Sequence, residues 1–478
     1  MGFTGLDYAV LFSYLFATAA FGAWLGRGQK NLRDYFLAGR SLPWWAICFS
    51  IVATETSTLT FIGAPAIAYE GNLTFLQVAF GYVVGRLLVS KILIPSYFRG
   101  DIQSAYEILT FRFGGKVRNF SALLFQINRA LADGVRLFAT ALVLSVVTQM
   151  TDIWTVVIIG VITIAYTFYG GMTAVVWNDA IQLVIYLGGA LLAGYLLLER
   201  IPGGWSEVVS AASFSHKFQI FDFSFSWSNP YTFSAGLLGG AFLTFATHGT
   251  DQMMVQRYLA CGSKRGSQAA LVVSGLVVVL QFLLFLLIGV MLFAFYQHFP
   301  LHQEIRQTNR IFPIFIVREM PAGISGLIIA AIFAAAMSTL SSSLNSLASS
   351  SVNDFYKSYL KPHASDGHYL AISRLFTLAW GVILVAVSVL ARNWGEVLQV
   401  GLTITSVTMG SILGIFLLGQ WTRRTSEAGA LTAMATSLLV MIGIHLSGAI
   451  AWPWYVLIGT VLTLAVGLLQ PLLGTGRR

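Results

Sequence analysis

The chain has 478 residues, of which 56% are hydrophobic and only 10% are charged, and its mean hydropathy is +0.76. A water-soluble domain cannot cover so much apolar surface, so this composition excludes a soluble enzyme and indicates a chain folded within a lipid bilayer. The formal net charge of +9 implies no nucleic-acid partner here, because the basic residues lie in short loops between apolar segments, where they orient helices across the membrane.

Thirteen apolar segments are long enough to cross a bilayer, at about 20 residues per crossing. They cover residues 7–26, 44–69, 73–96, 120–149, 153–169, 174–198, 232–256, 268–296, 322–350, 369–391, 397–420, 428–448 and 452–473. The first segment lacks the basic leader of a signal peptide, so it is expected to remain as a helix of the mature protein. The whole chain, residues 1–478, is therefore expected to be one all-α integral membrane domain of about thirteen transmembrane helices.

The distribution of basic residues predicts the orientation of these helices. The loop after the first segment carries four Lys or Arg residues, and the residues before that segment carry none. This asymmetry predicts an N-terminus outside the cell and, after thirteen crossings, a cytoplasmic C-terminus, where Arg477 and Arg478 lie. Four basic residues, Lys217, Arg306, Arg310 and Arg318, fall outside. They lie in longer loops, which are translocated with less regard for charge. The expected location is the inner membrane of the cell.

The second segment is polar in its middle, where Glu55 lies among Ser and Thr residues before Gly63 and Pro65. A helix of this composition is expected to be broken there. Lipid offers no hydrogen-bond partner for freed backbone groups, so an unwound stretch is tolerated only where it lines a polar cavity or binds an ion. The polar stretch is therefore a candidate binding site.

The seventh segment also predicts an interruption, because Gly236, Gly239 and Gly240 precede a polar run at residues 244–252. Two interrupted helices five segments apart are what an inverted repeat of five plus five helices produces. The expected units are an extra N-terminal helix at 7–26, a first repeat at 44–198, a second repeat at 232–420 and two extra C-terminal helices at 428–473.

A third polar cluster lies in the ninth segment, where seven of the nine residues from Ser338 to Ser346 carry a hydroxyl or an amide. Small-residue packing, with hydroxyls bonded back to their own helix, is the simpler explanation for any single member. The whole cluster suits a sodium ion better, because a hard cation prefers oxygen ligands.

Five segments of the chain resemble a known family in their order and spacing. They are FLAGRSLPWW at 36–45, TFIGAP at 60–65, YGGMTAVVWNDAIQ at 169–182, QRYLA at 256–260 and the serine-rich run that ends in Asn345 and Ser346. Together they resemble the sodium:solute symporter family, which includes sodium/glucose, sodium/proline, sodium/iodide, monocarboxylate and sialic acid symporters. The resemblance covers nearly the whole chain. It implies the leucine-transporter fold and sodium-coupled import of a small polar organic solute by alternating access, with no enzymatic activity.

The resemblance also implies where sodium binds. The expected first site uses the backbone carbonyls of Ala53, Thr56 and Ala335 and the hydroxyls of Ser338 and Thr339. A second sodium site, found in some members, would use Asp179, Ser341 and Ser342. Asp179 could instead pair with a nearby base, which would leave a single sodium ion.

Solute is expected between the two broken helices, as in the family. The expected solute-facing residues are Glu55, Ser57, Thr60, Gln77, Asp133, Arg136, Thr247, His248 and Asp251. Two alternatives stay open. Glu55 could form a structural salt bridge. Asp133 could pair with Arg136, three residues later, and then neither Asp133 nor Arg136 would contact solute.

The solute class follows from comparison with branches of the family. An acid at position 55 is similar to the proline symporters, whereas Thr247 departs from the aromatic gate of the sugar symporters. Residues 104–109 are closer to the anion and sialic acid branch. A sugar, an acidic sugar or an organic carboxylate is therefore favoured, with a proline-type amino acid symporter as the alternative and an ion channel as the alternative of another class. The expected partners are sodium ions, the solute and the bilayer, and the protein is expected to act as a monomer.

Overall fold

The computed structural model describes residues 3–25, 32–100, 102–300, 308–395 and 397–473. These described residues form helices and contain no strand. The longer helices are α1 (Gly5–Leu25), α3 (Trp44–Glu55), α4 (Thr58–Glu70), α5 (Leu76–Leu88), α8 (Gly115–Thr148), α9 (Asp152–Arg200), α10 (Gly204–Phe214), α11 (Gly240–Gly249), α13 (Lys264–His298), α15 (Ile324–Ser350), α16 (Asp366–Ala391), α17 (Val397–Trp421), α18 (Glu427–Ser447) and α19 (Pro453–Leu473). Shorter elements are α2 (Leu32–Leu37), η2 (Ala38–Arg40), η3 (Val89–Leu93), α6 (Ile94–Tyr97), α7 (Glu107–Arg112), η4 (Ala235–Gly239), α12 (Gln252–Ala260), η5 (Thr308–Arg310), α14 (Ile311–Glu319) and η6 (Ser351–Leu360).

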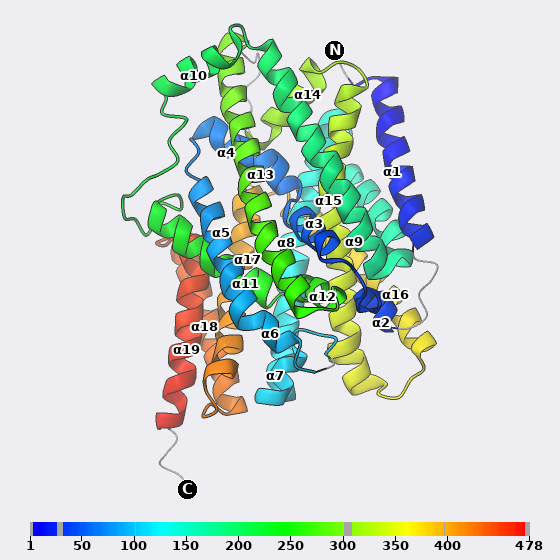
Figure 1. Ribbon diagram of the computed structural model, residues 1–478, viewed down its shortest axis with the longest axis vertical. Coiled ribbons are helices and arrows are strands. Elements are labelled where there is room, and N and C mark those ends of the chain that lie inside the picture. The colour runs from blue at the N-terminus through cyan, green and yellow to red at the C-terminus, as the bar shows by residue number, and fades with distance from the viewer. Residues whose placement is uncertain (1–2, 26–31, 101, 301–307, 396, 474–478) are drawn as a thin grey trace.

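Within the described residues, ten helices are long and apolar enough to cross a membrane, or eleven if the bent pair of α3 and α4 counts as one crossing. This confirms an all-helical membrane architecture, and the number of thirteen crossings stays a prediction. The difference has local causes. The predicted segment 153–169 corresponds to the shorter apolar helix Ile153–Ile164, which a non-helical kink at Gly171 (φ 56°) within α9 separates from the crossing Gly171–Arg200. The predicted segment 232–256 is divided among η4, α11 and α12. Figure 1 shows the long helices running between two ends of the molecule, with the N- and C-termini at opposite ends.

The predicted break in the second segment is confirmed. Helices α3 and α4 meet at an angle of 59°, and the two residues between them, Thr56 and Ser57, have extended backbone conformations. The C-terminal carbonyls of α3 and the N-terminal amides of α4 therefore lie in the protein interior without a continuous helix to pair them. Pro65 lies within α4 and does not coincide with the break.

The second break lies between α11 and α12, where Thr250 and Asp251 leave the helical conformation. The Asp251 side chain caps α12 by accepting a hydrogen bond of 2.8 Å from the backbone N–H of Met253. On the other side of the break, the Tyr258 hydroxyl donates to the carbonyl oxygen of His248 at 2.8 Å. Side chains thus satisfy backbone groups that the interruption frees.

Glycines let the second interrupted helix approach α5 closely. Gly81 and Gly85 on α5 face Gly236 and Gly240 on the η4–α11 segment, so each side of the contact has glycines four residues apart. A Cβ atom on Gly85 would lie only 2.4 Å from the carbonyl oxygen of Ala241. Small residues at four-residue spacing are typical of close helix packing in membranes. This contact fixes α11 beside α5.

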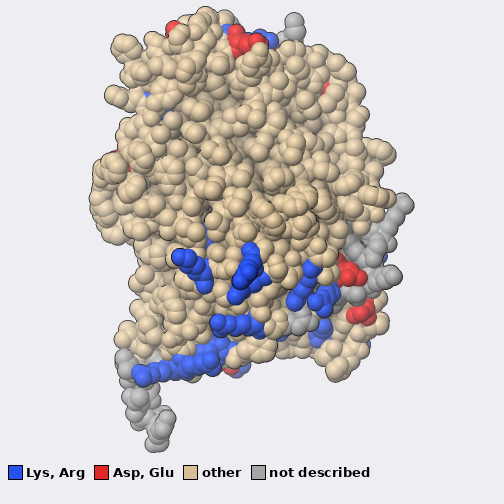
Figure 2. Space-filling model, viewed as in Figure 1, with Lys and Arg blue, Asp and Glu red and all other residues tan. Residues whose placement is uncertain are grey.

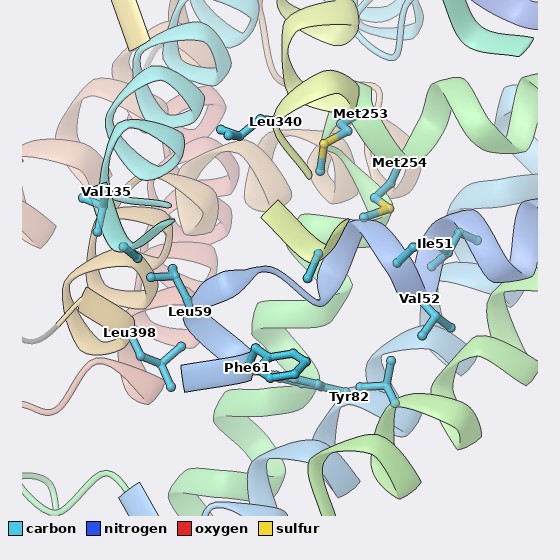
Figure 3. Close-up of a cluster of buried hydrophobic side chains, with 14 of the residues drawn as sticks. Ile51, Val52, Leu59, Phe61, Tyr82, Val135, Met253, Met254, Leu340 and Leu398 are labelled. Carbon is cyan, nitrogen blue, oxygen red and sulfur yellow. The ribbon is translucent and has the colours of Figure 1, made fainter. Parts of the chain in front are cut away.

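Apolar side chains surround the first break. Figure 3 shows Ile51 and Val52 on one side of it and Leu59 and Phe61 on the other, with Met254 of α12 nearby. All five are buried. Such a shell keeps lipid and bulk water away from the unwound residues, so polar groups there interact with one another or with a bound species.

Candidate functional site

A central cavity lies where the two interrupted helices meet. Apolar side chains of α5, α13 and α17 form part of its wall, among them Phe75, Tyr82, Phe282 and Leu398. Its polar lining residues are Thr54, Glu55, Ser57, Thr60, Arg129, Arg136, Thr244, Thr247, His248 and Thr405. Half of the twenty lining residues are therefore polar or charged, as suits a polar small molecule held by several convergent groups.

The structure brings six of the predicted solute residues to this cavity. They are Glu55, Ser57, Thr60, Arg136, Thr247 and His248. Among the described residues, Gln77, Asp133 and Asp251 lie outside the lining. The Gln77 amide donates to the carbonyl of Tyr231 at 3.0 Å and accepts from the backbone N–H of Asp222 at 3.1 Å, so it ties the loop between α10 and η4 to α5.

Asp133 and Asp251 belong to a buried ionic network beside the cavity. Asp133 accepts hydrogen bonds from Arg136, from Arg129 at 3.4 Å and from the Ser343 hydroxyl of α15. Arg129 also pairs with Asp251 at the second break. The pairing of Asp133 with Arg136 that the sequence allowed is therefore present. Arg136 nevertheless reaches the cavity, and its side chain retains 20% of its exposure.

Glu55 forms a second buried ionic cluster. Its carboxylate pairs with the Arg86 guanidinium of α5 and lies 3.6 Å from His248 Nε2. The same Arg86 nitrogen, Nη2, lies 3.3 Å from His248 Nε2. The salt bridge that the sequence allowed for Glu55 is thus present, with a partner that the sequence did not identify.

The predicted first sodium residues lie where the end of α3 meets α15. The Thr339 hydroxyl donates to the carbonyl of Thr54 at 2.9 Å and contacts the carbonyl of Ala335 at 3.3 Å. Ala53 lies in the last turn of α3, and Thr56 is the first residue of the break. Carbonyls at a helix end have no intrahelical partner, so this junction combines carbonyl and hydroxyl oxygens of the kind that sodium prefers.

Asp179 of α9 lies next to this junction. Its Oδ1 accepts from the Ser338 hydroxyl at 2.6 Å, and its Oδ2 accepts from the Ser50 hydroxyl at 2.5 Å and from Arg257 at 2.9 Å. Arg257 also donates to the Ser342 hydroxyl at 2.5 Å. The pairing of Asp179 with a base, left open by the sequence, is present.

Four residues that the sequence analysis did not assign take part in this region. Arg86, Arg129 and Arg257 form the three ionic contacts described above, and Gln281 of α13 donates to the Thr56 hydroxyl at the first break. A charged side chain within an apolar segment is itself a signal of function, because it is costly in a bilayer unless paired. That signal was available for Arg86 and Arg129, whereas Arg257 directly follows the predicted segment 232–256.

Comparison with known proteins identifies the family. Residues 35–437 match the family described as "Sodium:solute symporter family". The chain is 33% identical to the sodium/sialic acid symporter NanT of Aliivibrio fischeri, over 98% of this chain and 93% of that protein. It is 30% identical to the human sodium/iodide cotransporter, over 94% of this chain and 71% of that protein.

A solved structure is similar to nearly the whole chain. It is the substrate-bound outward-open state of a Na+-coupled sialic acid symporter, and it aligns with a TM-score of 0.91 at 30% identity over 98% of both chains. A family match of this length, together with relatives of at least 30% identity, assigns the chain to the family, and this assignment does not depend on any single residue. The protein belongs to the sodium:solute symporter family and is a sodium-coupled membrane symporter, not an enzyme.

Proposed function

We propose that this protein imports a small solute that carries a carboxylate, best matched by an acidic sugar of the sialic acid type. The charge distribution of the central cavity supports this proposal. The guanidinium groups of Arg129 and Arg136 line the cavity, whereas their partners Asp133 and Asp251 lie outside the lining formed by the described residues. The cavity therefore presents two guanidinium groups to a solute, beside the one carboxylate of Glu55.

The same side chains leave donors for an anion. The Nε atoms of Arg129 and Arg136 are buried and have no hydrogen-bond partner among the described residues. A guanidinium recognises a carboxylate through two parallel hydrogen bonds. The hydroxyls of Ser57, Thr60 and Thr244 add neutral hydrogen-bonding groups suited to a sugar. Two relatives similar to this chain carry sialic acid and iodide, and both of these solutes are anions.

We infer that sodium binds between α3 and α15, at Ala53, Thr56, Ala335, Ser338 and Thr339. An ion there would hold the end of α3 against α15 beside the solute cavity, because Thr54 and Glu55 of α3 line that cavity. Sodium would then favour the state that binds solute, and coupling would be the difference in affinity between states. Each sodium ion entering down the membrane potential contributes about 2.3 kcal/mol per 100 mV.

We propose a second sodium ion beside the first, at Asp179, Ser341 and Ser342. The two carboxylate oxygens of Asp179 divide their contacts, since Oδ1 faces Ser338 and Oδ2 faces Arg257. The Oδ1 side remains suited to a cation. The ion would share this carboxylate with Arg257, which predicts weaker binding than at an unpaired aspartate.

We also propose the arrangement of five plus five inverted helices, with residues 44–198 and 232–420 as the two repeats and thirteen crossings in all. The equivalent breaks of α3–α4 and α11–α12 support it. An external N-terminus and a cytoplasmic C-terminus are supported by the position of the two termini at opposite ends of the molecule (Figure 1). In Figure 2, Lys and Arg gather toward the end that carries the C-terminus, as expected for a cytoplasmic face. We propose the cell membrane as the location and a monomer as the working unit.

Solute binding to the purified protein tests the proposed substrate class. We would measure thermal unfolding with sialic acid, its methyl ester, lactate, glucose and proline, each in sodium and in potassium. The expected result is a rise in Tm with sialic acid in sodium, and little or no rise with the neutral ester or with glucose. A rise with proline alone would support the amino acid alternative, and equal effects of the acid and its ester would contradict recognition of a carboxylate.

A further inference from the structure

Arg86 is a fully buried cation that connects the two interrupted helices. Its side chain has 0% exposure and extends from α5. One of its nitrogens contacts both the Glu55 carboxylate and His248 Nε2, the latter at 3.3 Å. Glu55 is the last residue of α3, and His248 is next to the last residue of α11. One guanidinium therefore lies at the interrupted end of each broken helix.

The surrounding structure leaves room for this side chain. Gly275 of α13 packs against it, and a Cβ atom at that position would lie 3.1 Å from Arg86 Cδ and 3.3 Å from Nη1. The Nε and Nη1 donors of Arg86 are buried without a hydrogen-bond partner among the described residues. A buried, partly satisfied ion pair is a poor means of gaining stability, since apolar residues of similar volume often do better. A functional reason for Arg86 is therefore required.

The positions of the two half-helices suggest that reason. The C-terminal ends of α3 and α11 meet in the interior, and each carries partial negative charge from its carbonyl groups. Glu55 adds a full negative charge at the same place and lines the solute cavity. Left uncompensated, this concentration of negative charge would repel an anionic solute.

We propose that Arg86 is a positioning residue that determines solute specificity, a built-in cation that neutralises Glu55 and holds the ends of α3 and α11 together. This inference rests on the proposed anionic solute. With Arg86 in place, Glu55 contributes little net charge to the cavity, so no free carboxylate opposes a solute carboxylate that binds the Arg136 guanidinium. Without it, Glu55 faces the solute as a free carboxylate.

The test uses three variants in proteoliposomes: Arg86→Gln, Glu55→Gln and the double variant of both. Sodium-driven uptake of sialic acid and of its neutral methyl ester is measured for each. Arg86→Gln is expected to raise KM for sialic acid at least about tenfold, because like charges oppose each other in a desolvated site. The KM for the ester should change by less than about threefold. The double variant should restore the ratio of the two KM values to near that of the wild type.

Two results would overturn the proposal. One is an equal rise in KM for the acid and the ester in Arg86→Gln, which is what a merely structural role predicts. The other is a double variant whose ratio of KM values is no better than that of Arg86→Gln. If Arg86→Gln alone fails to fold, the double variant is compared with Glu55→Gln. The ratio of the KM for sialic acid to the KM for the ester should then be similar in these two variants, and a large difference would contradict the assigned role of Arg86.

A second measurement does not depend on the solute. In thermal unfolding without solute, Arg86→Gln should have a lower Tm than the double variant, because only the single variant leaves a buried, unpaired carboxylate. Equal Tm values would refute the compensation of Glu55 by Arg86. Failure of the proposed substrate has a different signature, since the wild-type protein itself would then transport sialic acid no better than its ester.

Discussion

Asp7 of α1 is a buried carboxylate that caps another helix. It accepts hydrogen bonds of 2.7–2.8 Å from the Ser325 hydroxyl and from the backbone N–H groups of Gly323 and Gly326, at the beginning of α15. Helix α15 carries Ser338 and Thr339 of the proposed sodium site. The N-terminal helix α1 is thus attached to the element that carries the proposed sodium site.

Replacing Asp7 tests this attachment. Asp7→Ala is expected to lower the free energy of unfolding by about 1–3 kcal/mol, because the amides at the start of α15 lose their acceptor in a buried place. The measurement is thermal unfolding of the purified protein. Asp366→Ala, at an exposed position in the first turn of α16, is the matched control and should change stability far less. Equal losses for the two variants would contradict the cap.

Arg136 gives a prediction about affinity. Arg136→Gln should raise KM for a carboxylate solute at least about tenfold with little effect on stability, because Asp133 keeps Arg129 and Ser343 as partners. Arg200→Gln, which removes an exposed ion pair with Glu319, is the control. An unchanged KM for the acid in sodium-driven uptake would exclude Arg136 from the solute site.

How far the sequence predicts the site is clear from individual residues. It identified Glu55 as a costly intramembrane carboxylate, and six of its solute residues line the cavity. It did not identify Arg86 as the partner of Glu55, because that pairing depends on how α5 packs against α3 and no spacing along the chain encodes it. For the same reason Arg257, although part of a recognised segment, had no role until Asp179 was found beside it.

At the scale of helices, the contact between α5 and the η4–α11 segment depends on glycine. Gly85→Ala is expected to destabilise the protein by about 1–3 kcal/mol, since its Cβ would meet the backbone carbonyl of Ala241 and neither element can yield without moving the second break. Gly188→Ala is the matched control, because nothing lies within 4 Å of a Cβ there. The Tm values of the two variants are measured. A decrease in Tm for Gly85→Ala that is no larger than the decrease for Gly188→Ala would contradict close packing.

Sequence patterns located the helices and most of the points at which they are interrupted. The polar runs predicted both interruptions, where the freed backbone groups need partners that lipid cannot supply. The predicted division of residues 153–198 into two helices agrees with the structure, because the backbone leaves the helical conformation at Gly171, between the apolar stretches Ile153–Ile164 and Gly171–Arg200. Whether a polar run interrupts a helix depends on the neighbouring helices, which a local pattern does not contain, since the polar run Ser338–Ser346 lies in the continuous helix α15.

For the whole molecule, the account predicts the side of the membrane on which each end lies. Cys261, partly exposed after α12, should lie on the cytoplasmic side, and Cys48 is buried. A membrane-impermeant maleimide should therefore label the native protein only after cells are permeabilised. A cysteine at exposed Ser206 of α10, near the opposite end in Figure 1, should be labelled in intact cells. The reverse pattern would invert the proposed orientation.

The central claim is that sodium bound between α3 and α15 drives uptake of an acidic solute. The most direct measurement is accumulation of sialic acid by proteoliposomes under an inward sodium gradient, for the wild type, Ser338→Ala, Thr339→Ala and the control Ser346→Ala. Among the described residues, the Ser346 hydroxyl donates to the Ser343 carbonyl of its own helix. The account predicts accumulation above the external concentration in the wild type and the control, and a loss of at least about tenfold in the other two. Accumulation that survives in both site variants, or equilibration without accumulation as in a channel, would contradict it.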